Sequence, residues 1–168
     1  ELEQFFDEVF SHTVLPVSVK TRLGIADPEE FPRLMEIYNC YPIACLTIHP
    51  RVQKQFYKGE VHSDAFAKAL EKSKNPVCYN GNLCALQQIR ELSAACPQLD
   101  AVMLGRGLIG DPGMLTPGGT KAETLEAFYD ALLEAYLEAF GGARNAMFRL
   151  KEHWRHLLCR FETCEKLS

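Results

Sequence analysis

The sequence lacks the features that mark membrane, secreted and zinc-binding proteins. None of its apolar runs approaches the roughly 18 residues that a membrane-spanning helix requires, and its first residues are acidic where a secretory signal would be basic. Its seven cysteines are odd in number and include no Cys-x-x-Cys pair, which argues against a disulfide framework and a zinc site. We therefore expect a cytoplasmic protein with no membrane partner and no bound metal.

Signatures of several enzyme classes are also missing. The chain has no Gly-x-Ser-x-Gly motif, Walker loop, His-Glu-x-x-His motif or protein-kinase signature. No methionine opens it, and its first residues already have the apolar spacing of a helix. We therefore expect a piece of a longer protein, whose 168 residues, 47% of them hydrophobic, suffice for one domain with a sizeable core.

What is present is a series of four short apolar runs, at 16–20, 44–48, 76–79 and 101–104. Each run ends in a polar or glycine-containing signature. The steps from Lys20 to His49, to Asn80 and to Gly105 are 29, 31 and 25 positions. Because this is the length of a strand, a helix and two loops, the spacing predicts successive βα units that feed a parallel sheet. Chemistry in such sheets gathers at the carboxyl ends of the strands.

Two α/β folds can contain four such units. Helices are expected at 1–12, 27–38, 63–73, 83–95, 121–140 and 143–167. A small doubly wound sheet would carry a glycine-rich loop after its first strand, and Thr21–Gly24 is a poor match. Because four parallel strands leave two open edges, we predict the second half of a TIM (β/α)8 barrel over 1–116, followed by a helical segment over 117–168. The exposed edges predict self-association.

Two consecutive turns form the strongest candidate binding site. Asn80–Asn82 and Gly105–Gly107 each place glycine where a strand gives way to a helix, so the backbone can approach an anion closely. Arg106 adds a guanidinium that can bind two phosphate oxygens at once. Loops after the last two strands are the usual phosphate site of barrels. The turns therefore predict phosphate binding, against the alternative of ordinary turns with a surface arginine.

Side chains near the ends of the first two runs are candidates for the chemistry. Lys20 would point toward the barrel mouth, where a cation stabilises developing negative charge, or would be a strand-end lysine reaching solvent. His49 is expected at the same level on the next strand. Arg22, Arg51 and Tyr57 are either surface residues or contacts for an anionic substrate at the rim.

Charge is distributed unevenly along the chain. Residues 1–142 contain 12 Lys and Arg against 19 Asp and Glu, whereas 143–168 contain 6 against 3. The C-terminal segment is therefore the better candidate for contact with a polyanion, although many solvated helix faces have the same composition.

Five segments resemble the second half of tRNA-dihydrouridine synthases. They are Pro16–Gly24, Leu46–Arg51, Gln55–Gly59, Tyr79–Asn82 and Asp100–Gly107, in the order and spacing of that family. The resemblance implies an FMN-containing TIM barrel followed by a helical domain that helps to hold tRNA. It also implies that NADPH reduces the flavin, which then reduces the C5–C6 bond of a uridine in tRNA.

The same resemblance implies roles for individual residues. Lys20 would approach the isoalloxazine ring, and its charge would favour the reduced, anionic flavin. His49 would also contact FMN. The ribityl phosphate would be bound by Asn80, Gly81, Asn82, Gly105 and Arg106. The residues near the substrate entrance would be Arg22, Arg51 and Tyr57. The residues of the last helix that face tRNA phosphates would include Lys151 and Arg155.

Two departures from the family pattern limit this resemblance. Pro50 stands where the family usually has glycine. The family's general acid is a cysteine in an Asn-x-Gly-Cys-Pro loop of the first half of the barrel, and no cysteine of this chain matches it, Cys96 included. We therefore expect no catalytic residue in this chain, no uridine reduction by the chain alone, and weak or no binding of FMN. The alternatives are another FMN- or phosphate-binding barrel oxidoreductase and a non-catalytic RNA-binding relic.

Overall fold

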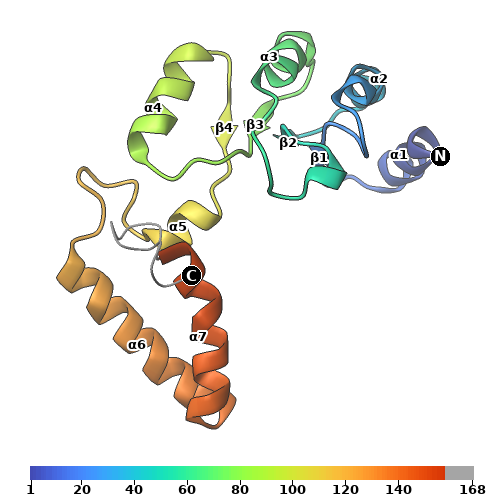
Figure 1. Cartoon of the computed structure of the whole chain (residues 1–168). Coiled ribbons are helices and arrows are strands. Elements are labelled where there is room, and N and C mark those ends of the chain that lie inside the picture. The colour runs from blue at the N-terminus through green and yellow to red at the C-terminus, as the bar shows by residue number, and fades with distance from the viewer. Residues whose placement is uncertain (158–168) are drawn as a thin grey trace. The chain divides into compact units, whose positions relative to one another are not determined.

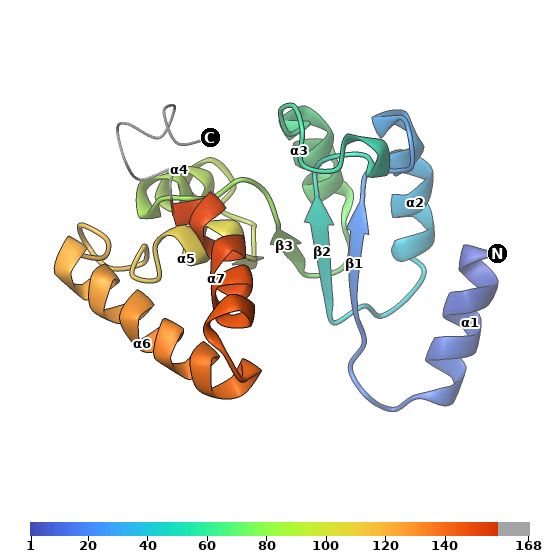
Figure 2. The same ribbon diagram turned by 60° about the horizontal axis from the view of Figure 1, so that its bottom comes forward.

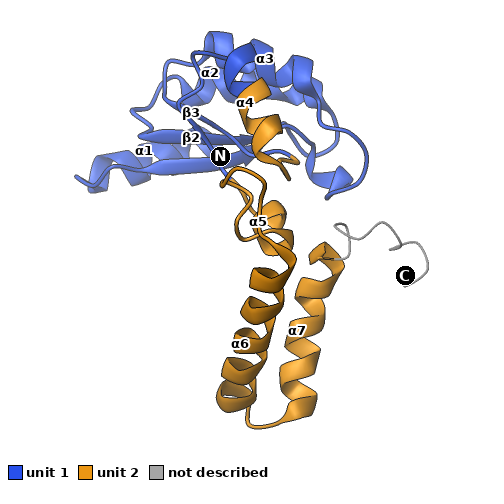
Figure 3. Ribbon diagram, turned by 90° about the vertical axis from the view of Figure 1, so that its left-hand side faces the viewer, with its two compact units in different colours: residues 1–81, 92–103 blue, residues 82–91, 104–168 orange. Residues whose placement is uncertain are grey.

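The structure, a computed structural model, describes residues 1–157. The chain divides into two compact units, coloured separately in Figure 3. Unit 1 comprises 1–81 and 92–103, and unit 2 comprises 82–91 and the chain from 104 onward. These units reflect compactness alone, so the expected division into a barrel part (1–116) and a helical segment (117–168) stays a prediction.

Unit 1 contains a four-stranded parallel sheet in the order β1-β2-β3-β4. The strands are β1 (Ser18–Arg22), β2 (Cys45–His49), β3 (Val77–Tyr79) and β4 (Ala101–Val102). Figure 2 shows β1 and β2 running in the same direction. Each crossover adds the next strand on the same side, as in a barrel wall, whereas a doubly wound sheet reverses its strand order at a switch point. The predicted α/β class of successive βα units is confirmed.

Helices α1 (Leu2–His12), α2 (Phe31–Tyr38) and α3 (Ser63–Lys72) cover one face of this sheet (Figure 1). The strand residues on that face are apolar and buried: Leu46, Ile48, Val77 and Tyr79. The Tyr79 ring packs edge-on against Phe66 of α3, with 4.8 Å between ring centroids. Burying one such side chain contributes about 1.5–3 kcal/mol, so this layer is the core of unit 1.

The opposite face of the sheet is polar because side chains alternate along each strand. The register pairs Lys20 with Thr47 and Thr47 with Cys78. Arg22 pairs with His49 two residues nearer the carboxyl ends of the strands. The same alternation that builds the core therefore gathers charged and polar groups on one surface of unit 1.

The remaining helices include a hairpin that confirms the predicted helical segment. Helix α4 (Leu86–Ala95) crosses the division between the units, and α5 (Arg106–Gly110), α6 (Ala122–Phe140) and α7 (Ala143–Leu157) lie in unit 2. Helix α6 ends at Gly141, whose φ of 66° is left-handed and favours glycine. The rest of the expected helix 143–167 lies outside the described residues. Within 1–157, none of the helices has the length and apolar character needed to cross a bilayer.

Helix α4 starts three residues later than the predicted Leu83. The side chain of Gln88 accepts hydrogen bonds from the backbone N–H groups of Cys84 (2.7 Å) and Ala85 (3.2 Å). The side-chain oxygen of Asn82 instead accepts a bond from Arg106. A local side-chain acceptor thus fixes the helix start.

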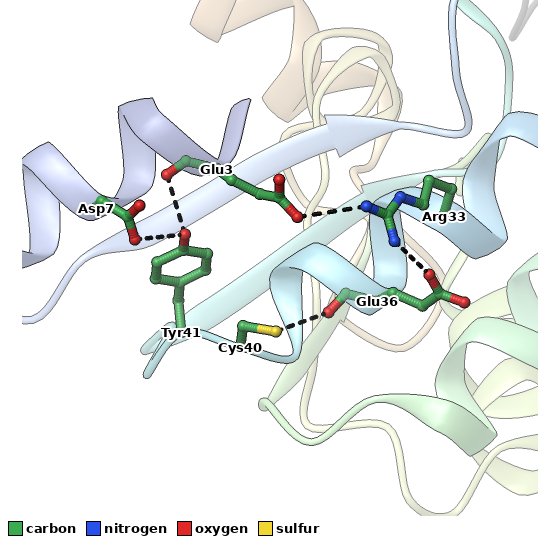
Figure 4. A network of polar contacts seen from close by, with 6 residues as sticks. All are labelled: Glu3, Asp7, Arg33, Glu36, Cys40 and Tyr41. Carbon is green, nitrogen blue, oxygen red and sulfur yellow. Dashed lines mark hydrogen bonds and ion pairs between the residues drawn. The ribbon is translucent and has the colours of Figure 1, made fainter. Parts of the chain in front are cut away.

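A polar network attaches α1 to the chain around α2 (Figure 4). The Tyr41 hydroxyl lies 2.8 Å from an Asp7 carboxylate oxygen and 3.0 Å from the Glu3 carbonyl. Arg33 contacts Glu36 at 2.8 Å and Glu3 at 3.5 Å. Desolvation, followed by the contact with Asp7, raises the pKa of Tyr41 to about 12. The hydroxyl therefore stays protonated, as the contact with a carboxylate requires, well into the alkaline range.

The loop after β1 is closed by a carboxylate. Glu30 accepts hydrogen bonds from the backbone N–H groups of Ile25, Ala26 and Asp27 at 2.8–3.0 Å. These bonds, led by that from Ile25, hold the pKa of Glu30 below its usual 4.5. Charged Glu30 therefore stabilises the loop.

We predict that Glu30→Gln lowers stability at neutral pH, because an amide oxygen accepts these bonds less strongly than a carboxylate. The folded pKa is lowered, so the stabilisation is present above the unfolded value and is lost as pH falls through the folded one. Urea unfolding of the wild type and of Glu30→Gln across this pH range should show that the difference between their free energies of unfolding vanishes in acid. The control, Glu29→Gln, should show no pH-dependent change in its stability difference from the wild type. A stability difference between Glu30→Gln and the wild type that persists in acid would contradict the role assigned to the Glu30 carboxylate.

Candidate functional site

The polar face of unit 1 places Lys20 and His49 on the same side of the sheet. Strand β1 continues to Arg22, so Lys20 lies mid-strand, and the partner of His49 is Arg22 rather than Lys20. The expectation that Lys20 and His49 lie at the same level is therefore wrong by two residues, because the register is set by backbone pairing. Both side chains still share a face of the sheet. His49 lies two residues after Thr47, the partner of Lys20, and side chains two residues apart on a strand point to the same side.

Arg22 and Arg51 hold the loop that follows β2, residues 52–59. Arg22 Nη1 donates to the carbonyls of Val52 (3.0 Å) and Phe56 (2.8 Å). Arg51 is fully buried and donates through Nη2 to the carbonyl of Gly59. A buried cation requires such hydrogen bonds. These contacts give both guanidinium groups a part in shaping the loop.

Arg51 also lies beside the candidate histidine. Its Nη1 is 3.4 Å from Nε2 of His49, and His49 is itself 5% exposed. The ring of Tyr57 lies 5.9 Å from the His49 ring and 5.5 Å from the Arg22 guanidinium. Four of the residues predicted from the sequence, Arg22, His49, Arg51 and Tyr57, are thus brought together at the carboxyl ends of β1 and β2.

The sequence analysis did not single out Phe56. Its side chain is 68% exposed, and its backbone φ is 51°, in the left-handed region. A bulky side chain rarely adopts this conformation, which costs on the order of 1–3 kcal/mol. The available signal was an aromatic pair, Phe56 and Tyr57, inside a polar loop.

In unit 1 the first predicted phosphate turn lies beside the end of β4. The side chain of Asn80 donates to the carbonyl of Met103 at 3.0 Å, and the N–H of Met103 donates to the carbonyl of Tyr79 at 2.8 Å. A Cβ at Gly81 would overlap the Tyr79 ring. Glycine is therefore required here by close packing.

In unit 2 the continuation of that turn contacts the second one. Arg106 Nη2 donates to the side-chain oxygen of Asn82 at 2.7 Å. A Cβ at Gly107 would overlap the carbonyl oxygen of Leu83, whereas a Cβ at Gly105 would meet nothing within 4 Å. Within unit 2, Asn82 of the first predicted phosphate turn therefore contacts Arg106 of the second, and the backbone at Gly105 is open.

Helix α5, which carries Arg106, is backed by the helical hairpin. The Tyr129 hydroxyl of α6 donates to the carbonyl of Ile109 at 3.1 Å. A Cβ at Gly110 would lie 2.7 Å from the carbonyl oxygen of His156 on α7. Burial, followed by the positive charge of Arg106, lowers the pKa of His156. Within unit 2 the hairpin therefore contacts the helix that carries Arg106 of the second predicted phosphate turn.

The two predicted tRNA contacts, Lys151 and Arg155, are both exposed on α7. Their spacing of four residues places them on the same face of the helix.

Among residues 1–157, no three His, Cys, Asp or Glu side chains lie close enough together to hold a metal ion. Burial raises the pKa of the Cys78 thiol, which makes this thiol a poor nucleophile.

The chain is similar to known proteins over nearly its whole length. Residues 1–160 match the family model described as dihydrouridine synthase (Dus). Over 159 residues the chain is 29% identical to a probable tRNA-dihydrouridine synthase of Rickettsia prowazekii (strain Madrid E) and 31% identical to that of Rickettsia conorii (strain ATCC VR-613 / Malish 7). Each comparison covers 83% of this chain and 48% of the relative.

A third relative is the tRNA-dihydrouridine(16) synthase of Escherichia coli O157:H7, 32% identical over 102 residues, which are 60% of this chain and 32% of the relative. The chain spans about half the length of the two Rickettsia proteins. The family match covers the strands, the two turns and the hairpin alike, so the resemblance drawn from five short segments is confirmed. The chain belongs to the dihydrouridine synthase family.

Proposed function

We propose that this chain supplies the phosphate-binding turns and one wall of the flavin site of a tRNA-dihydrouridine synthase. The whole protein would use NADPH and FMN to reduce the C5–C6 bond of a uridine in tRNA. The observation that carries the proposal is the contact of Arg106 with Asn82, which joins the two glycine-containing turns. The other support is the family membership of the chain.

The residues of the two turns fit a phosphate monoester. Arg106 offers a charged fork of N–H donors, the geometry suited to phosphate oxygens. The backbone at Gly105 has room for close approach, because even an added Cβ would meet nothing within 4 Å. The site would therefore bind the ribityl phosphate through Arg106, Asn82 and the backbone around Gly105, with Asn80 and Gly81 completing the first turn.

The polar face of the sheet would supply the wall beside the isoalloxazine ring. When bound, FMN supplies the hydride-transfer chemistry that no side chain can provide. Lys20 would place a cation beside the ring, where it stabilises negative charge. His49, held between Arg51 and Tyr57, would contact the ring at a fixed position. No residue of this chain is assigned to protonate C5, which we assign to a cysteine elsewhere in the whole protein.

The RNA would be held by the helical segment and by the rim of the polar face. Lys151 and Arg155 would contact phosphates, so binding should weaken as salt rises. A uridine must leave its stack to be reduced, and Arg22, Arg51 and Tyr57 would border its entrance. Together with the acidic character of the remaining chain, this assignment would put the tRNA backbone on α7.

We further propose that the protein is cytoplasmic, as its substrate would require, and that isolated chains associate through their strand edges.

The phosphate assignment is tested by comparing FMN with riboflavin, which lacks the phosphate, in calorimetric titrations of the chain. We expect weak binding of FMN and at least about tenfold weaker binding of riboflavin, because charge-assisted hydrogen bonds contribute about 1.5–3 kcal/mol. Arg106→Gln should lower the affinity for FMN about tenfold and leave that for riboflavin unchanged.

The matched control is Arg90→Gln, which removes an exposed arginine of α4 and should alter neither affinity. Equal affinities of the chain for FMN and riboflavin would contradict the phosphate assignment. Equal losses of affinity for FMN in the Arg106 and Arg90 variants would contradict the specific role of Arg106 in phosphate binding.

A further inference from the structure

The loop 52–59 presents an aromatic ring to solvent at a cost in backbone strain. Phe56 is 68% exposed and has a φ of 51°. Folding alone favours neither property, because an exposed ring adds little to the core and glycine adopts this φ without strain. A strained residue that persists on a surface is typical of a functional contact.

The strained turn is held from both strands of the polar face. Arg22 of β1 donates to the carbonyl of Phe56 itself, at 2.8 Å. Arg51, two residues after the end of β2, donates to the carbonyl of Gly59 at the other end of the loop. Within the loop, the Gln55 side chain accepts a bond from the N–H of Val52 at 2.8 Å. The turn that carries the ring is therefore held in place by side-chain hydrogen bonds.

The surroundings of the ring match an unpaired nucleobase. Tyr57 is the next residue and is 60% exposed, with the Arg22 guanidinium 5.5 Å from its ring. Lys54 and Lys58, both exposed, flank the pair on the same loop, and Glu60 follows it. Aromatic rings that alternate with cations are typical of single-stranded nucleic-acid sites, where bases stack and phosphates are attracted. Two rings are too small a surface for a stable protein partner, which needs about 800 Å² per side.

We propose that Phe56 is a stacking platform for an unpaired base of the RNA substrate, held in place by Arg22 as a positioning residue. This inference rests on the proposed function, and it adds to that function a residue that contacts the base. Tyr57 supplies the second ring, and the cations of the loop attract the phosphates that flank the base.

The test uses Phe56→Gly, because glycine adopts a left-handed φ freely. The variant should melt at the wild-type temperature or above it, yet bind a short single-stranded oligouridylate and unmodified tRNA about tenfold more weakly, as expected for the loss of one stacked base. Binding is measured by fluorescence anisotropy and melting by circular dichroism. Phe56→Trp, which keeps a ring, should stay within about threefold of the wild type, whereas Phe56→Leu should resemble the glycine variant.

Each outcome decides between the inference and the proposed function. A wild-type chain that binds neither RNA would contradict both. Wild-type binding with equal binding by Phe56→Gly would contradict the stacking role alone. A glycine variant that melts well below the wild type would show that Phe56 serves the fold, and wild-type binding to duplex RNA as tight as to oligouridylate would show that no unpaired base is recognised.

Discussion

Gly107→Ala should lower the free energy of unfolding by about 2 kcal/mol, although the same substitution normally stabilises a helix by about 1 kcal/mol. The added Cβ would overlap the carbonyl oxygen of Leu83 and lie 3.1 Å from Cα of Cys84. Both are backbone atoms, so the turn at 82–84 must move for the methyl group to fit. The melting temperature should fall by about 5 °C, and FMN binding should fall with it because the two turns separate.

Gly105→Ala is the matched control, since it adds the same methyl group two residues earlier, where nothing lies within 4 Å. Its melting temperature should stay within about 1 °C of the wild type. Its affinity for FMN should still fall relative to riboflavin, because the methyl group occupies the approach of the phosphate to the backbone. Calorimetric melting and titration of the two variants separate these effects, and equal melting temperatures would refute the overlap at Gly107.

Arg51→Met should lower the free energy of unfolding by about 3 kcal/mol. The substitution keeps an apolar stem but leaves the Gly59 carbonyl without the donor that Arg51 provides. It also removes the guanidinium that lies 3.4 Å from His49. Arg51→Lys should recover only part of the loss, because a single ammonium cannot reproduce the planar fork. Urea unfolding measures the loss, and limited proteolysis should show faster cleavage in the loop 52–59.

The control for Arg51 is Arg33→Met, the same substitution at an arginine whose side chain is 68% exposed. Arg33 contacts Glu36 and Glu3 at the surface, and exposed ion pairs of this kind contribute less than about 1 kcal/mol. The Arg51 variant should therefore lose roughly three times as much. Similar losses in the two variants would mean that burial of Arg51 has no energetic consequence.

Much of the fold follows from short-range patterns. The four apolar runs predicted the strands because a strand buried against helices must be apolar, and the spacing between the runs left room for one helix each. Sequential order in a parallel sheet then agrees with a barrel, and the family folds as a TIM barrel, which confirms the predicted fold class. The glycines at 81 and 107 were also informative, because an added Cβ would overlap the Tyr79 ring at 81 and the Leu83 carbonyl at 107.

Other features depend on contacts that a linear pattern does not contain. The relative level of Lys20 and His49 was predicted wrongly because the register of β1 and β2 depends on backbone pairing across 27 positions of sequence separation. The start of α4 depends on one glutamine side chain. The donation of Arg22 to carbonyls thirty and thirty-four residues later likewise cannot be read from the sequence, where an arginine at the end of a strand looks available for substrate.

The contact of α5 with the hairpin bears on how this protein can be dissected. Tyr129 and His156 contact the short helix that follows Gly105, so deleting α6 and α7 to obtain a minimal flavin-binding piece would remove structural support along with the proposed RNA-binding surface. Loss of FMN binding in such a truncation would then report a collapsed scaffold rather than a missing ligand. Point changes at exposed residues of α7, such as Lys151, are the cleaner way to separate the two proposed activities.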